Sequence, residues 1–193
     1  MAIEFELKYS AEPEAQAAIF EAYPGEYQVF EMETTYFDTA DGALSLRHVT
    51  LRRRMENGVS VCTVKTPVSG YGRGEWECEC EDIHVAIDRL VELGAPRDLL
   101  LLTVEGVTPV CGAKFTRRAL TVAHQDATVE LALDRGILLG GGKEIPLCEV
   151  EVELKSGQPE QAVAFAQALA EKFGLQSENR SKFRRALSLA KGE

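Results

Sequence analysis

The sequence lacks any apolar stretch long enough to cross a bilayer. Its longest aliphatic run, residues 99–102, is four leucines, whereas a membrane-spanning helix needs roughly 20 apolar residues. The first eight residues carry three charges and no apolar run, so they do not resemble an export signal. We therefore expect a cytoplasmic protein that does not bind membranes.

Cysteine and histidine are present only in patterns that carry no recognisable chemistry. The five cysteines are odd in number and form no paired CxxC framework, which favours free thiols in a reducing compartment. The three histidines are widely scattered, and no Ser-His-Asp or Cys-His arrangement is recognisable. Neither a disulfide framework nor a nucleophilic triad is indicated.

No repeat, low-complexity tract or linker divides the 193 residues, so we expect a single domain over residues 1–193. The formal net charge of -10 disfavours diffuse binding to nucleic acid or to an anionic membrane. The expected partner is a small molecule, and the chain is expected to be a monomer or a homodimer.

Strand-like stretches dominate the chain. Eight segments are rich in β-branched residues and alternate with period two: 3–9, 33–38, 50–55, 59–66, 74–81, 113–124, 127–136 and 147–155. Four segments predict helices: 10–23 capped by Ser10, 83–93 capped by Asp82, 159–173 and 181–190. Many antiparallel strands with a few helices predict the α+β class.

Charged residues recur at every second position of these strands. Glu4, Glu6 and Lys8 alternate with Phe5 and Leu7, which in a strand places the charges on one face and the apolar groups on the other. Further charges at alternate positions are Arg52, Arg54, Lys65, Arg73, Glu75, Glu77, Glu130, Asp134, Glu149, Glu151 and Glu153. For any one strand, an ordinary solvated face is the simpler interpretation.

Across six strands the solvated-face interpretation is harder to hold. Like charges at neighbouring positions on one face repel each other, unless cations bridge the carboxylates and a polyanion lies between the basic groups. Hard oxygen ligands suit Mg²⁺ or Mn²⁺, and guanidinium groups match phosphate oxygens. The pattern therefore predicts a cavity for a polyphosphate bound together with metal ions.

The opposite, apolar faces of the strands need cover, which the helices can supply from outside. We therefore expect a closed eight-stranded antiparallel β-barrel with helices packed on the outside, because a barrel of about this size can hold one small ligand. If the charged positions of each strand face inward, five side chains at the alternate positions point outward and serve as packing residues. They are Trp76, Cys62, Cys78, Cys80 and Cys148.

The ordered set of motifs resembles the CYTH superfamily, the triphosphate tunnel metalloenzymes. The resemblance spans nearly the whole chain and rests on Glu4-Phe5-Glu6-Leu7-Lys8 (ExExK), Tyr36-Phe37-Asp38, Leu51-Arg52-Arg53-Arg54 (LRxR), Thr63-Val64-Lys65 (TxK), Arg73-Gly74-Glu75-Trp76-Glu77 (RxExE), Arg117, the acidic stretches 130–134 and 149–153, and Ser181-Lys182. The family fold that this resemblance implies is an eight-stranded antiparallel tunnel.

The resemblance also implies roles for individual residues. Catalysis is assigned to Glu4, Glu6 and Lys8. Substrate binding is assigned to Lys8, Arg52, Arg54, Lys65, Arg73, Glu75, Glu77, Arg117 and Lys182. Mg²⁺ or Mn²⁺ would be held by Glu4, Glu6, Glu130, Asp134, Glu149 and Glu151.

The expected function is metal-dependent hydrolysis of tripolyphosphate to pyrophosphate and phosphate. Three alternatives stay open: a class IV adenylate cyclase, a thiamine or nucleoside triphosphatase, and a polyphosphate-binding module without catalysis. The full set of expected metal ligands argues against the last of these, because binding alone can rely on basic residues.

Overall fold

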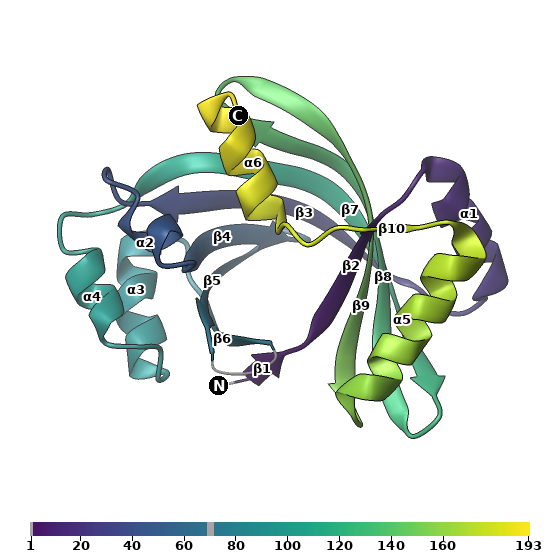
Figure 1. Cartoon of the computed structure of the whole chain (residues 1–193). Coiled ribbons are helices and arrows are strands. Elements are labelled where there is room, and N and C mark those ends of the chain that lie inside the picture. Colours follow the sequence, from purple (N-terminus) through teal and green to yellow (C-terminus); the bar gives the residue numbers. More distant parts are fainter. Residues whose placement is uncertain (1, 69–71) are drawn as a thin grey trace.

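The computed structural model of the chain describes residues 2–68 and 72–193. Ten strands in this part form one antiparallel sheet in the order β1-β6-β5-β4-β3-β7-β8-β9-β2-β10 (Figure 1). Their bounds are β1 Ala2–Glu4, β2 Glu6–Ser10, β3 Gln28–Asp38, β4 Thr50–Glu56, β5 Val59–Pro67, β6 Arg73–Glu79, β7 Thr108–His124, β8 Ala127–Gly140, β9 Lys143–Ser156 and β10 Gln176–Ser177. All eight predicted strand segments lie in this sheet, so the α+β class is confirmed.

The predicted closed eight-stranded barrel is wrong, because hydrogen bonds do not close the described sheet. The segment predicted as one strand over 3–9 changes partners at Phe5. Its first part, β1, pairs with β6, and its second part, β2, pairs with β9. No single strand therefore pairs with both β6 and β9, and the sheet is a curved, open one that bends around a hollow (Figure 1).

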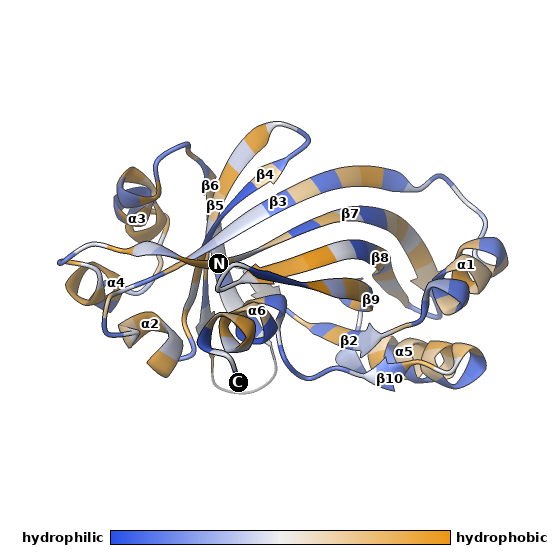
Figure 2. Cartoon of the chain, turned by 90° about the horizontal axis from the view of Figure 1, so that it is seen from above, coloured by the Kyte–Doolittle hydropathy of each residue, from blue (hydrophilic) through white to orange (hydrophobic). Residues whose placement is uncertain are grey.

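Two groups of helices cover the convex face of the sheet. Helices α1 (Pro13–Ala22) and α5 (Pro159–Phe173) pack over β2, β8 and β9, with Ile19, Phe165 and Val152 in a shared core. Helices α2 (Ala43–Leu46), α3 (Ile83–Glu92) and α4 (Asp98–Leu102) pack over β4–β6. Figure 2 shows that hydrophilic and hydrophobic residues alternate along β3 and β7. Because successive side chains of a strand point to opposite faces, this alternation gives the sheet one polar and one apolar face.

The core under α3 confirms the predicted packing roles of Trp76, Cys62, Cys78 and Cys80, whereas Cys148 is half-buried and belongs to none of the cores among the described residues. Trp76 and Cys62 are buried against α3, and Cys78 and Cys80 pack beside them. Burial raises the pKa of the Cys62 thiol to about 12, so this side chain stays uncharged and behaves as a small apolar group.

The C-terminal helix α6 (Lys182–Lys191) differs from the others, because it lies against the inner face of the sheet. Phe183 and Ala186 form a third core with the inward-facing Met32, Tyr36 and Phe115. The expectation that all helices pack outside is therefore wrong for α6, which crosses one end of the hollow (Figure 1).

Of the two helix caps that the sequence predicts, the structure shows one. Asp82 caps α3 as predicted, since its side chain accepts a hydrogen bond from the backbone N–H of His84. Ser10 does not cap α1. It lies in β2, its hydroxyl donates to the carbonyl of Gln176, and α1 begins only at Pro13 after Glu12.

None of the helices in the described residues is both long and apolar enough to pass through a membrane.

Candidate functional site

A cavity of about 340 Å³ lies on the inner face of the sheet, under α6. Thirteen of the fifteen residues that the sequence predicts as site residues line it: Glu4, Glu6, Lys8, Arg52, Arg54, Lys65, Arg73, Glu75, Glu77, Arg117, Glu130, Glu151 and Lys182. The other two, Asp134 and Glu149, are fully buried directly beside it. The structure therefore brings the whole predicted set together.

The strand register places charged residues of opposite sign next to each other. Lys8 on β2 lies opposite Glu151 on β9, Arg117 on β7 lies opposite Asp134 on β8, and Lys65 on β5 lies opposite Glu75 on β6. Because residues directly opposite each other in an antiparallel pair have side chains on the same face, each pair projects from the inner face of the sheet.

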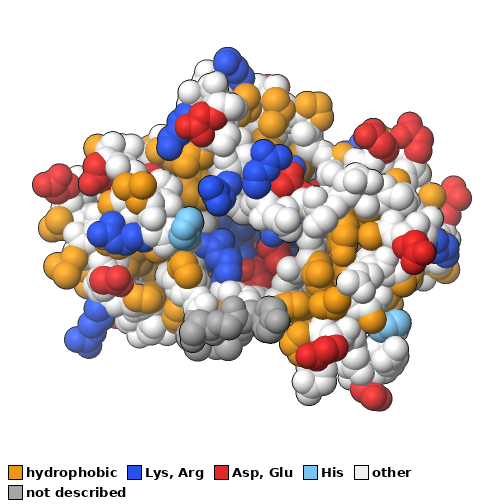
Figure 3. Space-filling model, viewed as in Figure 1, with side chains coloured by type: hydrophobic (Ala, Val, Ile, Leu, Met, Phe, Trp, Pro, Cys, Tyr) orange, Lys and Arg blue, Asp and Glu red, His pale blue; other side chains and the backbone are white. Residues whose placement is uncertain are grey.

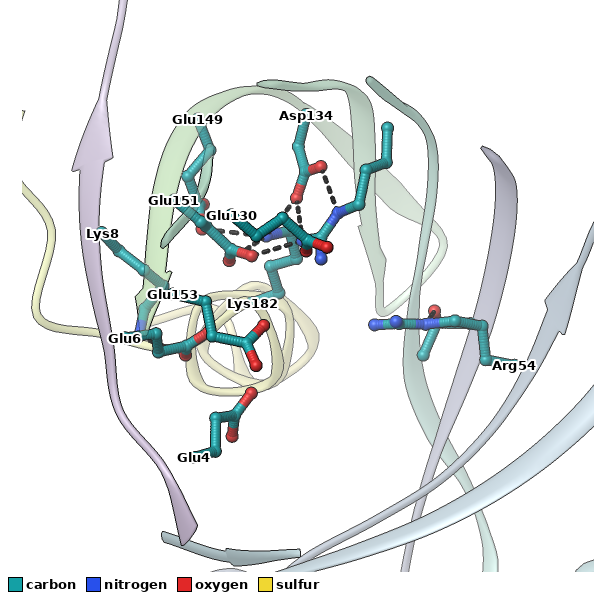
Figure 4. A network of polar contacts seen from close by, with 12 residues as sticks. Glu4, Glu6, Lys8, Arg54, Glu130, Asp134, Glu149, Glu151, Glu153 and Lys182 are labelled. Carbon is teal, nitrogen blue, oxygen red and sulfur yellow. Dashed lines mark hydrogen bonds and ion pairs between the residues drawn. The ribbon is translucent and has the colours of Figure 1, made fainter. Parts of the chain in front are cut away.

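Lys182 is the centre of a buried ion-pair network (Figure 4). Its Nζ lies 2.8 Å from an oxygen of Asp134, 2.9 Å from one of Glu149 and 2.7 Å from one of Glu151. Arg117 binds both oxygens of Asp134, at 2.8 and 2.7 Å, and also contacts Glu151. Three carboxylates and two cations are thus held together in one largely buried cluster.

The network separates the proton affinities of two neighbouring acids. Burial raises the pKa of Glu149 to about 7, although Lys182 and Arg185 oppose the shift. Burial would also raise the pKa of Glu151, but Lys182 and Arg117 overcome it and hold that pKa well below its usual range. Burial alone would lower the pKa of Lys182, and its three carboxylate neighbours raise it instead. Against the effect of burial, Asp134 and Glu151 likewise raise the pKa of Arg117 above its usual range. Glu151, Lys182 and Arg117 are therefore firmly charged members of the network.

The opposite wall of the cavity, on β4, holds its counter-ions more loosely, since the Arg54 guanidinium lies 3.5 Å from a carboxylate oxygen of Glu56. Figure 4 shows Arg54 across the cavity from the acidic residues. Burial, together with the neighbouring charge of Arg52, lowers the pKa of Arg54 to about 10. The guanidinium of Arg52 lies 3.7 Å from a carboxylate oxygen of Glu75, and Arg52 Nε is buried without a hydrogen-bond partner in the described part of the chain. This wall has unused capacity to bind an anion.

Two further acids of the cavity are each neutralised by a lysine. Lys65 Nζ lies 2.5 and 2.6 Å from the two oxygens of Glu4, and Lys8 Nζ lies 3.0 Å from Glu6. Counted over the whole lining, eight basic residues face eight acidic ones: Lys8, Arg52, Arg54, Lys65, Arg73, Arg117, Lys155 and Lys182 against Glu4, Glu6, Glu56, Glu75, Glu77, Glu130, Glu151 and Glu153. The lining is therefore electrically balanced.

The donor chemistry of the acids fits a hard divalent cation, because every candidate ligand is a carboxylate oxygen. The positions are not preassembled. Among residues 2–68 and 72–193, no group of three or more His, Cys, Asp or Glu side chains is arranged to hold a metal ion. Ammonium and guanidinium groups contact the carboxylates instead. The ion pairs of Glu4, Glu6 and Glu151 would therefore have to open before these side chains could hold a metal.

Three contributors to the site lie outside the set of residues assigned from the sequence. Arg185, one helical turn after Lys182, contacts Glu149. Lys155 Nζ lies 2.8 Å from Glu153 and 3.6 Å from Glu130. Gln16 on α1 donates to the backbone beneath Asp134 and Glu149. The spacing of Arg185 and the period-two position of Lys155 were available signals, whereas nothing in the sequence marks Gln16.

A curved antiparallel sheet, a charged cavity on its inner face and a helix across one end define the α+β architecture of this chain. The CYTH domain matches residues 2–187, and the chain belongs to the CYTH family.

The chain is also similar to individual proteins. It is 29% identical over 156 residues to an inorganic triphosphatase of Haemophilus influenzae, a match that covers 75% of this chain and 42% of that protein. The chain thus spans less than half of that relative's length. HpAC1 from Hippeastrum, a putative adenylyl cyclase, shares the fold with a TM-score of 0.68 and 19% identity, over 100% of this chain and 97% of that one. That protein is described as having a dominant triphosphatase activity. The PH1819 protein of Pyrococcus horikoshii OT3 also shares the fold, with a TM-score of 0.64 and 23% identity. That match covers 96% of this chain and 99% of that one.

Proposed function

We propose that this chain is a metal-dependent triphosphatase that hydrolyses tripolyphosphate to pyrophosphate and phosphate in the inner cavity. The observation that carries the proposal is the β4 wall, where the buried Arg54 and the half-buried Arg52 face a wall of carboxylates. Their own counter-ions lie as far as 3.5 and 3.7 Å away, and Arg52 Nε has no partner among the described residues. Family membership and the similarity to an inorganic triphosphatase support it.

The balanced lining supports metal dependence. A tripolyphosphate carries several negative charges, and eight basic residues already neutralise eight acidic ones. A bare polyanion would therefore leave the cavity strongly negative, whereas a polyanion accompanied by divalent cations would not. Glu4, Glu6, Glu130, Asp134, Glu149 and Glu151 are the residues proposed to hold Mg²⁺ or Mn²⁺. Such an ion would supply positive charge to phosphate oxygens and make a water molecule more acidic.

The positions of the chain's own residues support the following proposed roles. Arg52, Arg54 and Lys65 on one side, and Lys8, Arg117 and Lys182 on the other, bind phosphate oxygens and align the phosphate chain. A water molecule attacks the terminal phosphorus, the bond to the bridging oxygen breaks, and Glu4 or Glu6 accepts the proton of the water. The basic residues stabilise the charge that accumulates on the leaving pyrophosphate.

The test is release of phosphate from tripolyphosphate, ATP and thiamine triphosphate, each with Mg²⁺, with Mn²⁺ and with EDTA. The proposal expects turnover that favours tripolyphosphate and stops with EDTA. Turnover that persists in EDTA would contradict the metal dependence. No release from any of the three would contradict the triphosphatase function, and cyclase and polyphosphate-binding assays would then be the next measurements.

A further inference from the structure

The Phe115 side chain on β7 is buried, with 4% of its surface exposed. In the sheet, β7 lies between the β4 wall of the cavity and the acidic strands β8 and β9. The ring belongs to the same core as Met32 and Phe183, both of which line the cavity. Gly136 lies opposite it on β8, where an added Cβ would come within 2.7 Å of the Cβ of Phe115. The glycine therefore leaves room for one large ring between the two walls.

Three basic groups from three different elements lie over this ring. Its centroid is 5.7 Å from the guanidinium carbon of Arg54 on β4, 6.0 Å from that of Arg117 on β7 and 5.2 Å from Nζ of Lys182 on α6. The mouth of the cavity is visible in Figure 3 as a hollow with Lys and Arg side chains around it and carboxylates inside it. A cation within about 6 Å of a ring centroid is attracted by the electron-rich face of the ring, and more strongly where water is excluded.

The three cations differ in what else holds them. Lys182 and Arg117 form contacts of 2.7 to 2.9 Å with carboxylate oxygens. The ion pair of Arg54 with Glu56 is longer, at 3.5 Å, and its Nε donates to the uncharged Thr34 hydroxyl at 3.0 Å. Burial lowers the pKa of Arg54 to about 10, and repulsion from neighbouring guanidinium groups, Arg117 among them, adds to the shift. Arg54 is therefore the cation that depends most on the ring.

An aromatic ring suits this position better than an acid would. A carboxylate at position 115 would neutralise Arg54 and occupy N–H donors that a phosphate needs. The face of a phenylalanine ring attracts the guanidinium and uses none of its N–H donors. A cation that is already in place also spares the substrate the cost of ordering it during binding.

We propose that Phe115 is a positioning residue, whose ring holds Arg54 at the phosphate site against the repulsion of Arg117 before the triphosphate binds. This proposal rests on the proposed function, since it takes Arg54 as a phosphate-binding group. It implies that the electron density of the ring, and not its shape alone, sets the affinity for a triphosphate.

The experiment replaces Phe115 with phenylalanine analogues that carry one, two and three ring fluorines. These analogues keep the ring nearly the same size and weaken its attraction for cations step by step. Calorimetry in the presence of Mg²⁺ measures the binding of inorganic imidotriphosphate, a non-hydrolysable analogue, and thermal melting measures the stability of each variant. The matched control places the same analogues at Phe37, a buried residue of the core under α3. A second series at position 115 carries Arg54→Ala.

At Phe115 the dissociation constant is expected to rise with each added fluorine, to about tenfold with three. It is expected to stay within about twofold for the Phe37 series, and also for the series with Arg54→Ala, which leaves the ring no Arg54 to hold. A flat series at Phe115, an equal rise at Phe37, or an undiminished rise with Arg54→Ala would overturn this proposal while the proposed function stands. A wild type that binds no imidotriphosphate and hydrolyses no tripolyphosphate would overturn the proposed function as well.

Discussion

The side-chain amide of Gln16 donates a hydrogen bond of 2.9 Å to the main-chain carbonyl of Glu149. It donates a second one, also of 2.9 Å, to the carbonyl of Asp134. Gln16 belongs to α1 on the convex face, whereas Glu149 and Asp134 direct their carboxylates to Lys182 on the inner face. One buried amide thus fixes, from outside the sheet, the backbone that carries two acids of the site.

We expect Gln16→Ala to lower both stability and activity. The substitution leaves two buried carbonyls without this donor, which costs about 1 to 3 kcal/mol of unfolding free energy, and it frees the backbone of two acidic residues to shift. Urea denaturation and phosphate release measure the two effects. The control is Gln167→Ala on the exposed face of α5. Equal stability of the two variants would show that the Gln16 hydrogen bonds do not matter.

The two walls of the cavity are expected to affect different kinetic parameters. Arg54→Ala removes a phosphate-binding group, so KM for tripolyphosphate is expected to rise about 10- to 100-fold with a smaller change in kcat. Glu4→Gln keeps the shape but removes a proton acceptor and metal ligand, so kcat is expected to fall about 100-fold or more. Steady-state phosphate release measures both parameters.

The control for both substitutions is the exposed ion pair between Lys114 and Glu33, with an N–O distance of 2.8 Å. Lys114→Ala and Glu33→Gln are expected to leave kcat and KM nearly unchanged, because exposed pairs contribute little. If Arg54→Ala and Glu4→Gln reduced kcat and raised KM to the same extent, the division of roles would be refuted.

Gly140 is expected to be essential for the docking of α6. A Cβ at this position would lie 2.3 Å from the carbonyl oxygen of Ala186 and 2.7 Å from the nitrogen of Ala190, both backbone atoms that cannot yield. Gly140→Ala is therefore expected to displace α6, and with it Lys182, so that thermal stability falls and KM for tripolyphosphate rises.

Gly142→Ala is the matched control for Gly140→Ala. Gly142 has φ +73°, and a Cβ added to it would meet no atom of the described residues within 4 Å. Its substitution therefore carries only the left-handed backbone penalty of about 1 kcal/mol. If the two variants had the same melting temperature and the same KM, close packing of Gly140 against α6 would not be what holds the helix.

The metal-free protein is expected to lose stability as pH rises towards 7. Because burial raises the pKa of Glu149 to about 7, the native state keeps a proton that the unfolded chain releases near pH 4.5. The unfolded state therefore binds fewer protons in this range, and the free energy of unfolding falls as pH increases. Glu149→Gln removes this titration.

The measurement is urea denaturation of the wild type and Glu149→Gln in EDTA between pH 5 and pH 7.5. Over this range the wild type is expected to lose about 1 to 3 kcal/mol relative to the variant. Parallel pH profiles for the two proteins would show that Glu149 is already ionised at pH 5 in the folded state.

The sequence alone determined which face of each strand carries charge. Alternation with period two is a local property of extended backbone, so the inward positions of Glu6, Arg54 and Glu151 and the outward position of Trp76 were all predictable. Helix α5 was predicted with the observed bounds, because Pro159 and Gly174 are local start and stop signals.

Only the tertiary structure decided how these faces are assembled. The change of partner at Phe5, which leaves the sheet open, depends on pairing with β6 and β9, strands about 70 and 150 residues away along the chain. The inward docking of α6 depends on Gly140 and on an apolar inner surface around Tyr36. The amphipathic pattern of a helix predicts that one of its sides is buried, but it does not predict which face of a sheet that side packs against. That choice is made by shape and packing between segments that are remote in sequence.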